Sequence, residues 1–272
     1  QWDIWNQNIG PDGKHVSGYR LLKVNGVEVR SQAEIADVLA GEIPGEVKTS
    51  VGFVAGETIS VTLELANGDI KDFQVTLGVF PIADRNSYLV LPALVSAIFL
   101  LMSLWIFGLR RTESAGRSFS IFASSLSIAT GTLFNIYTTH QFTYLWTFSV
   151  AMVGGSMLDM AMTFPQEFRP AIQRPYLRWI GYSVAFVMAA LAFPKLTDFD
   201  HAFAYAGAWL NIYLFTALCG LAYFGFTIYH SIKSPSPVVK SQAVTILIGS
   251  TIGFSGMIYW MLTAGIPSLT FP

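Results

Sequence analysis

An acidic side chain interrupts a long apolar stretch in the middle of the chain. Asp159 follows the apolar run 153–158 and precedes Phe164-Pro165 by a few residues. A carboxylate in hydrocarbon is costly, so such a residue usually faces a partner or a water-filled cavity. One interpretation is that Asp159 binds a ligand or takes part in a switch. The other is that it reaches the membrane interface or pairs with Arg169 or Arg178.

Two side-chain amides add further polar groups to apolar segments. Asn135 and Asn211 both lie in or near stretches long enough to cross a membrane. Hydrogen bonding between helices is the ordinary explanation for such residues, with about 0.6 kcal/mol per contact. Lining of a pocket is the alternative. We therefore take Asp159, Asn135 and Asn211 as the candidate ligand-binding residues.

Catalytic and metal-binding patterns are missing from the sequence. A zinc protease needs His-Glu-x-x-His on one helix, whereas the four histidines lie in separate segments: His15, His140, His201 and His230. An aspartyl protease needs two intramembrane Asp residues, of which only Asp159 is evident. A serine enzyme would pair Ser156 with a base that the sequence does not identify. The sequence therefore predicts no enzyme activity, no metal site and no cofactor.

The composition differs between the two parts of the chain. Of the 272 residues 53% are hydrophobic and only 12% are charged, with a mean hydropathy of +0.50, which is outside ordinary globular usage. Residues 1–86 nevertheless hold 12 of the 17 acidic residues. We expect a soluble domain over 1–86 and a domain embedded in membrane lipid over 87–272. The net charge of −1 argues against nucleic acid as a partner.

The polar N-terminal part has the pattern of a small α+β domain. Residues 18–29 alternate around Asn25-Gly26, which favours a tight hairpin turn. Ser31 followed by Glu34 indicates the start of a short helix that ends near Gly41. Residues 58–65 and 70–77 alternate with a period of two and predict two further strands.

This order of elements resembles a PDZ domain over residues 16–78, through the stretch Gly18-Tyr19-Arg20-Leu21-Leu22-Lys23-Val24-Asn25-Gly26 and the Pro44-Gly45 turn. In that family a peptide terminus adds as a strand beside a helix, and a Gly-rich loop holds its carboxylate. The resemblance implies a groove at Gly18, Tyr19, Arg20 and Leu21, with 10–13 and 51–56 as candidate carboxylate loops. Peptide or protein binding and a rigid lid or dimerisation surface remain open, because fold alone does not fix function.

From Tyr88 onward the chain predicts an α-helical polytopic membrane bundle. Six segments are long enough to cross a hydrocarbon core of about 30 Å. Aromatic residues near their ends, among them Trp146 and Tyr182, are typical of interface anchors. Gly249-x-x-x-Gly253 permits close helix approach, within the bundle or in a homodimer. The expected spans are 88–109, 118–138, 145–164, 179–194, 203–229 and 241–264.

Basic residues predict the orientation of these spans in the plasma membrane. One set of loops holds eight Lys and Arg residues, whereas the other holds only Lys195. Because cationic residues stay on the cytoplasmic side, the N-terminal domain should be extracytoplasmic. An outside domain needs a signal or anchor, so we expect that a segment before Gln1 has been removed. We also expect at least one more span after Pro272.

The membrane part resembles the sensor region of bacterial histidine kinases related to the competence quorum-sensing kinase. The resemblance lies in the domain order and in short motifs, which are Arg110-Arg111, Thr163-Phe164-Pro165 and Lys240-Ser241-Gln242. It implies a receptor of the two-component type that relays an extracytoplasmic signal to an output domain. The sequence contains no kinase core, so we expect that output domain outside this chain. A non-catalytic accessory subunit of a larger membrane complex is the alternative. A transporter is disfavoured because the spans lack repeats.

Overall fold

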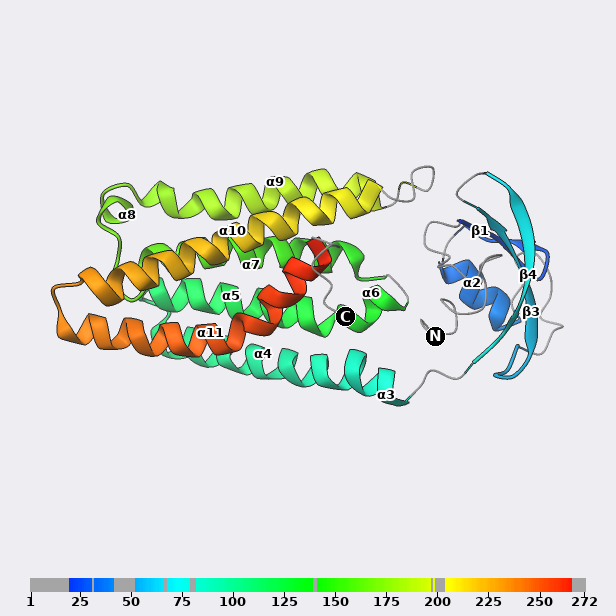
Figure 1. Cartoon of the computed structure of the whole chain (residues 1–272), viewed down its shortest axis with the longest axis horizontal. Helices are drawn as coiled ribbons and strands as arrows, with labels where there is room; N and C mark the ends of the chain where they lie inside the picture. The colour runs from blue at the N-terminus through cyan, green and yellow to red at the C-terminus, as the bar shows by residue number, and fades with distance from the viewer. Residues whose placement is uncertain are drawn as a thin grey trace. The chain divides into compact units, whose positions relative to one another are not determined.

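A computed structural model describes residues 20–30, 32–41, 52–65, 68–78, 82–138, 141–196, 198 and 204–265. Gly18, Tyr19 and the candidate carboxylate loop 10–13 lie outside these ranges. Of the other candidate loop, 51–56, the structure describes residues 52–56. The chain forms two compact units, the first made of Gln1–Val90 with Tyr137–His140 and the second of Leu91–Ile136 with Gln141–Pro272. Figure 1 shows a small unit with a sheet and a larger unit made of helices.

The N-terminal unit is an antiparallel sheet with one helix against it. Its strands are β1 (Arg20–Val24), β2 (Val27–Glu28), β3 (Thr58–Glu64) and β4 (Ile70–Thr76), in the order β2-β1-β3-β4, and its helix is α2 (Gln32–Leu39). Asn25 and Gly26 have positive φ angles of 48° and 82°, as the predicted hairpin turn requires. Val38 of α2 packs with Val24, Ile59 and Val61 of the strands. The predicted hairpin, helix and two strands are confirmed.

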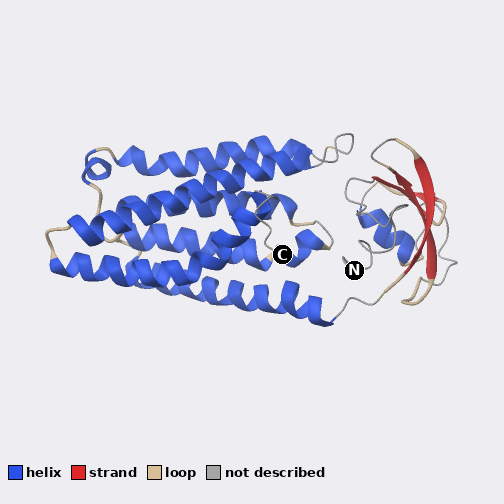
Figure 2. Cartoon of the chain, viewed as in Figure 1, coloured by secondary structure: helices blue, strands red, loops and turns tan. Residues whose placement is uncertain are grey.

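The second unit is helical throughout its described elements (Figure 2). Most connections between the long helices are short. The first unit ends with α3 (Ile82–Arg85) and the π-helical turn η1 (Asn86–Val90). The helical elements that follow are, in chain order, α4 (Leu91–Arg110), α5 (Ser114–Gly131), α6 (Leu133–Tyr137), α7 (Thr143–Thr163), α8 (Arg169–Gln173), the 3-10 turn η2 (Pro175–Arg178), α9 (Trp179–Leu196), α10 (Ala204–Lys233) and α11 (Pro237–Gly265).

Five described helices are long and apolar enough to cross a membrane, which indicates that the chain is a multi-pass membrane protein. They are Asn86–Arg110, Thr143–Thr163, Pro175–Leu196, Ala204–Lys233 and Pro237–Phe254. The expected span 118–138 is not among them. Its helix, α5, runs instead from Ser114 to Gly131, and α6 follows after a turn at Thr132. Six serines lower the hydropathy of α5 below that of the other long helices.

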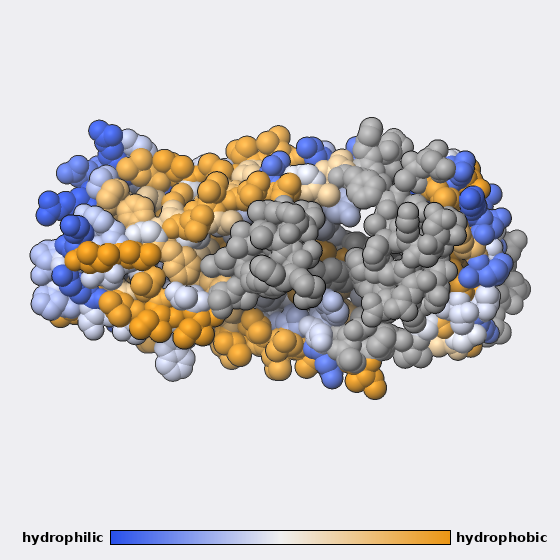
Figure 3. All heavy atoms as spheres, viewed as in Figure 1, coloured by the Kyte–Doolittle hydropathy of each residue, from blue (hydrophilic) through white to orange (hydrophobic). Residues whose placement is uncertain are grey.

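Helix α7 lies at the centre of the helical unit and contacts α5, α9 and α10. Its most apolar window is 78% buried, compared with 6% for α4 and for α11. Trp146 on α7 is 4% exposed and packs against Trp209, so its prediction as an interface anchor was wrong. Hydrophobic residues cover much of the visible face of the helices, and hydrophilic residues gather at the end that carries α8 (Figure 3).

Small residues allow α7 to approach its neighbours closely. A Cβ atom added at Gly155 would lie 2.8 Å from the carbonyl oxygen of Gly181 on α9, which is shorter than real Cβ contacts. Gly249 and Gly253 behave differently, because a Cβ at either would meet none of the described atoms within 4 Å. The described part of the unit therefore does not use the predicted glycine face of α11 for packing.

Candidate functional site

Asp159 is buried on α7 and forms a two-pronged ion pair with Arg178 of η2. The residue is 3% exposed. Arg178 donates from Nε to Oδ1 of Asp159 at 2.6 Å and from Nη2 to Oδ2 at 3.1 Å. This geometry gives two parallel charge-assisted hydrogen bonds, the strongest arrangement between these side chains. Of the two predicted arginine partners, the structure places Arg178 against Asp159.

Two hydroxyl groups complete the surroundings of the carboxylate. Ser118 of α5 donates to Oδ2 of Asp159 at 2.6 Å, and Tyr182 of α9 donates to the same oxygen at 3.0 Å. Thr163 lies one turn after Asp159 and donates to its main-chain carbonyl at 2.9 Å. We refer to Ser118, Asp159, Thr163, Arg178 and Tyr182 as the polar cluster. The cluster connects three helices through a single carboxylate.

Helical spacing brings these groups together. Asp159 and Thr163 are four residues apart on α7 and so lie on one face, one turn apart. The same spacing separates Arg178 and Tyr182, where η2 continues into α9. Ser118 enters from α5, which packs against α7. The side chain of Asp159 is 4% exposed and that of Arg178 is 22% exposed, so the carboxylate is the more deeply buried partner.

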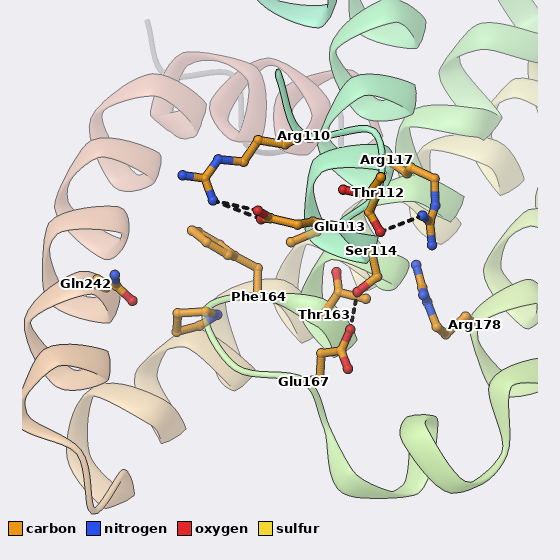
Figure 4. A pocket seen from close by; sticks show the side chains of 12 residues that line it. Arg110, Thr112, Glu113, Ser114, Arg117, Thr163, Phe164, Glu167, Arg178 and Gln242 are labelled. Atoms are coloured by element: carbon orange, nitrogen blue, oxygen red, sulfur yellow. Dashed lines mark hydrogen bonds and ion pairs between the residues drawn. The ribbon is translucent and has the colours of Figure 1, made fainter. Parts of the chain in front are cut away.

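A polar pocket of about 630 Å³ lies beside the cluster, between the α4–α5 turn and the segment after α7 (Figure 4). Arg110 donates from Nη1 to both carboxylate oxygens of Glu113 at 2.9 Å, and Ser114 donates to Glu167. The charged and amide groups that line this pocket are Arg110, Glu113, Arg117, Glu167, Arg178 and Gln242.

A second pocket of about 530 Å³ is also lined by Arg178 and lies between α5, α7 and α9. We call it the apolar pocket, because five of its eight lining residues are apolar or aromatic. They are Ile121, Met152, Pro175, Trp179 and Tyr182, and Arg117, Asp159 and Arg178 complete the lining. Arg117 and Arg178 therefore line both pockets.

The three candidate ligand-binding residues do not meet in one place. Asn135 lies on α6, where its Oδ1 accepts the N–H of Phe142 at 2.6 Å, so it stabilises the connection to α7. Asn211 lies on α10 with an exposed side chain. Neither residue lines a pocket that contains Asp159. A site shared by all three is therefore not supported, and ligand binding at Asp159 stays a prediction.

Two of the four predicted groove residues, Arg20 and Leu21, lie on β1. They pair with Glu64 and Leu63 of β3 in antiparallel register. Peptide addition at this strand stays a prediction, because the other two residues fall outside the described ranges.

The described residues contain no group of three His, Cys, Asp or Glu side chains that could hold a metal ion. Of the four histidines, His230 lies within the described ranges. It is buried on α10, and its Nε2 has no hydrogen-bond partner among the described atoms. The other three histidines lie outside the described ranges.

Sequence reasoning missed the hydroxyl groups of the cluster and the polar contact between α4 and α5. Ser103 of α4 donates to the carbonyl of Ser120 at 2.8 Å, and Ser96 donates to the carbonyl of Ser127 at the same distance. The one hint in the sequence is the spacing of Arg178 and Tyr182, which are one helical turn apart and so share a helix face.

Comparisons with protein-family models, with curated proteins and with solved structures found no match to this chain. The resemblances to a PDZ domain and to histidine kinase sensors therefore stay predictions.

Proposed function

We propose that the chain is a sensor module of the plasma membrane. In this proposal, the N-terminal domain is PDZ-like and extracytoplasmic and receives a signal, which changes the packing of the helical unit. The helical unit then passes the change to an output domain or protein of the two-component type. The observation that carries the proposal is the polar cluster, which fixes α5, α7 and α9 to one another through one buried carboxylate.

The chemistry of the cluster favours a switch over a purely stabilising role. A buried ion pair adds little net stability, because desolvation offsets much of the attraction between the charges. Removal of one of the two residues, however, leaves the other charge buried without a partner and strongly destabilises the structure. Such a pair therefore specifies one arrangement of helices against others. Arg178 lines both pockets, so a small displacement of α9 would leave its guanidinium with pocket water as an alternative partner.

We further propose that α5 is the sixth span. With 18 residues it is about 27 Å long at 1.5 Å per residue, close to the thickness of the hydrocarbon core. Its polar groups are compatible with lipid because the hydroxyls of Ser120 and Thr130 donate to carbonyls of the preceding turn, and that of Ser118 donates to Asp159. Helices α4 and α7 cover much of its surface.

The eight basic residues at alternate loops support an extracytoplasmic N-terminal domain. They include Arg110 and Arg117 beside the polar pocket, which places the cluster near the cytoplasmic surface in this proposal. A switch at that position would be suited to transmit a change in helix packing to a cytoplasmic partner.

Replacement of the chromosomal gene by single-residue alleles tests this function. We expect Asp159→Asn, which keeps the shape and removes the charge, to change the same transcripts as deletion of the gene does, in either direction. Asp37→Asn, which removes an exposed carboxylate of α2, should behave as the wild type. Membrane-fraction blots should show equal amounts of all three proteins, so that loss of protein is separated from loss of relay.

Two results would reject the sensor proposal. One is a transcript profile that deletion leaves unchanged, and the other is a profile of Asp159→Asn that is identical to the wild type at equal protein level. Co-purification of a stoichiometric membrane partner, with that partner's activity lost on deletion but kept in Asp159→Asn, would identify an accessory subunit instead.

A further inference from the structure

Arg117 carries a charge that the described part of the chain does not neutralise. Its Nη1 donates to the main-chain carbonyls of Arg111 and Thr112, both at 3.1 Å. Arg110 is paired with Glu113, and Arg178 is paired with Asp159, but Arg117 forms no ion pair with a described carboxylate. Five donors sit on a guanidinium, so further hydrogen bonds to an anion are available to Arg117.

The charged residues that line the apolar pocket leave a net positive charge, which suits one negatively charged group. Arg117, Asp159 and Arg178 are the only charged residues among its lining, and together they carry a net charge of +1. A phosphodiester carries one negative charge and accepts several hydrogen bonds, which matches two guanidinium groups. Figure 4 shows Arg117 and Arg178 on the same side of the neighbouring polar pocket.

The rest of the apolar pocket is suited to hydrocarbon. Ile121 on α5, Met152 on α7 and Trp179 on α9 line it. Trp179 is 68% exposed on a helix that is apolar enough to span a membrane, so its ring is accessible to lipid. The pocket volume of about 530 Å³ falls in the range of small-molecule sites. A basic end joined to an apolar groove between transmembrane helices is the pattern of binding sites for anionic lipids.

We propose that this pocket binds one anionic membrane phospholipid, with its phosphate against Arg117 and Arg178 and one acyl chain along Ile121, Met152 and Trp179. The site requires that the helical unit lies in a membrane, but it does not require the signalling role proposed above. A lipid bound there would contact α5, α7 and α9 next to the polar cluster, three residues of which line the same pocket.

Native mass spectrometry of the full chain, released from detergent with defined lipids, tests the proposal. We expect dioleoyl phosphatidylglycerol to bind at least about fivefold more tightly than dioleoyl phosphatidylcholine, because both lipids carry the phosphodiester but the cationic choline of the second would lie close to two arginines. Arg117→Gln should reduce that preference by about fivefold. Arg169→Gln, which removes an exposed arginine at the same end of the unit without touching either pocket, should change it less than about twofold.

A second variant separates a lipid from a free anion. Ile121→Trp fills the apolar pocket and keeps every charge, so it should weaken the binding of both lipids, and glycerol phosphate should not compete. Equal affinity for the two lipids would overturn the proposal. So would equal effects of Arg117→Gln and Arg169→Gln, or binding that survives Ile121→Trp and is displaced by glycerol phosphate, which would identify a site for a soluble phosphate.

Discussion

The two ends of the ion pair between Asp159 and Arg178 should differ in how much they contribute to stability. Arg178→Met leaves the carboxylate of Asp159, whose side chain is 4% exposed, with only the hydroxyls of Ser118 and Tyr182 as donors. An unpaired buried charge destabilises a protein by about 3–5 kcal/mol. Asp159→Leu leaves a guanidinium that is 22% exposed and can turn into the polar pocket. We expect a smaller loss there, of about 1–2 kcal/mol.

The double variant Asp159→Leu/Arg178→Met leaves no charge unpaired. It loses only the acceptor of the two hydroxyls, at about 1–2 kcal/mol in total. The double-mutant cycle should therefore give a coupling energy of about 2 kcal/mol or more, whereas interhelical hydrogen bonds in membranes average about 0.6 kcal/mol and reach about 1.7.

The assay is reversible unfolding of the purified protein in bicelles, with the free energy of unfolding measured for the wild type and the three variants. The exposed pair Arg110–Glu113 is the control, and Arg110→Met with Glu113→Gln should give a coupling energy below about 1 kcal/mol. A coupling energy for Asp159 and Arg178 at or below the average for a hydrogen bond would refute the reasoning. So would a larger loss for Asp159→Leu than for Arg178→Met.

Two further predictions concern the helical packing and the orientation of the chain. Gly155→Ala should lower the free energy of unfolding by about 1–3 kcal/mol, because the added Cβ would lie 2.8 Å from the carbonyl oxygen of Gly181. Gly207→Ala, with nothing within 4 Å, should have little effect, and equal effects in the same bicelle assay would contradict the described contact of α7 with α9. An impermeant maleimide should label Asp37→Cys in intact cells and Arg111→Cys only after permeabilisation, whereas the reverse pattern would invert the proposed topology.

The elements that local sequence patterns govern were predictable. Asn25-Gly26 has the positive φ angles that its residue types favour, and the strands on both sides follow from alternation. The five apolar helices follow from length and hydropathy alone. Both signals act within a few residues of sequence, so tertiary contacts do not override them.

Helix α5 shows where that reasoning ends. Its serines make the segment look weakly apolar, but the hydroxyl of Ser127 donates to a carbonyl of the neighbouring helix α4 and that of Ser120 to a carbonyl of the preceding turn. Whether a serine faces lipid or a partner helix depends on which helices become neighbours, and periodicity does not reveal that. The helix over this expected span is also interrupted, because α5 ends at Gly131 and α6 begins at Leu133.

The polar cluster was predictable only in part. Asp159 was identified because a carboxylate in an apolar segment needs a partner, and Arg178 was one of two partners considered. Tyr182 has the position expected of an interface anchor, and nothing local distinguishes that role from its hydrogen bond to Asp159. Ser118 is 41 residues away from Asp159 in the sequence, so only the fold brings the two together.

The central claim is that the polar cluster holds α5, α7 and α9 in one arrangement, and the distance between spin labels tests it directly. Labels at Arg111→Cys, just before α5, and at Ser183→Cys on α9 occupy exposed positions, and the buried Cys219 can be replaced by Ala. We predict one narrow distance distribution for the otherwise wild-type protein, and a broadened or two-peaked distribution when Asp159→Asn is added. Identical distributions with and without Asp159→Asn would contradict the claim.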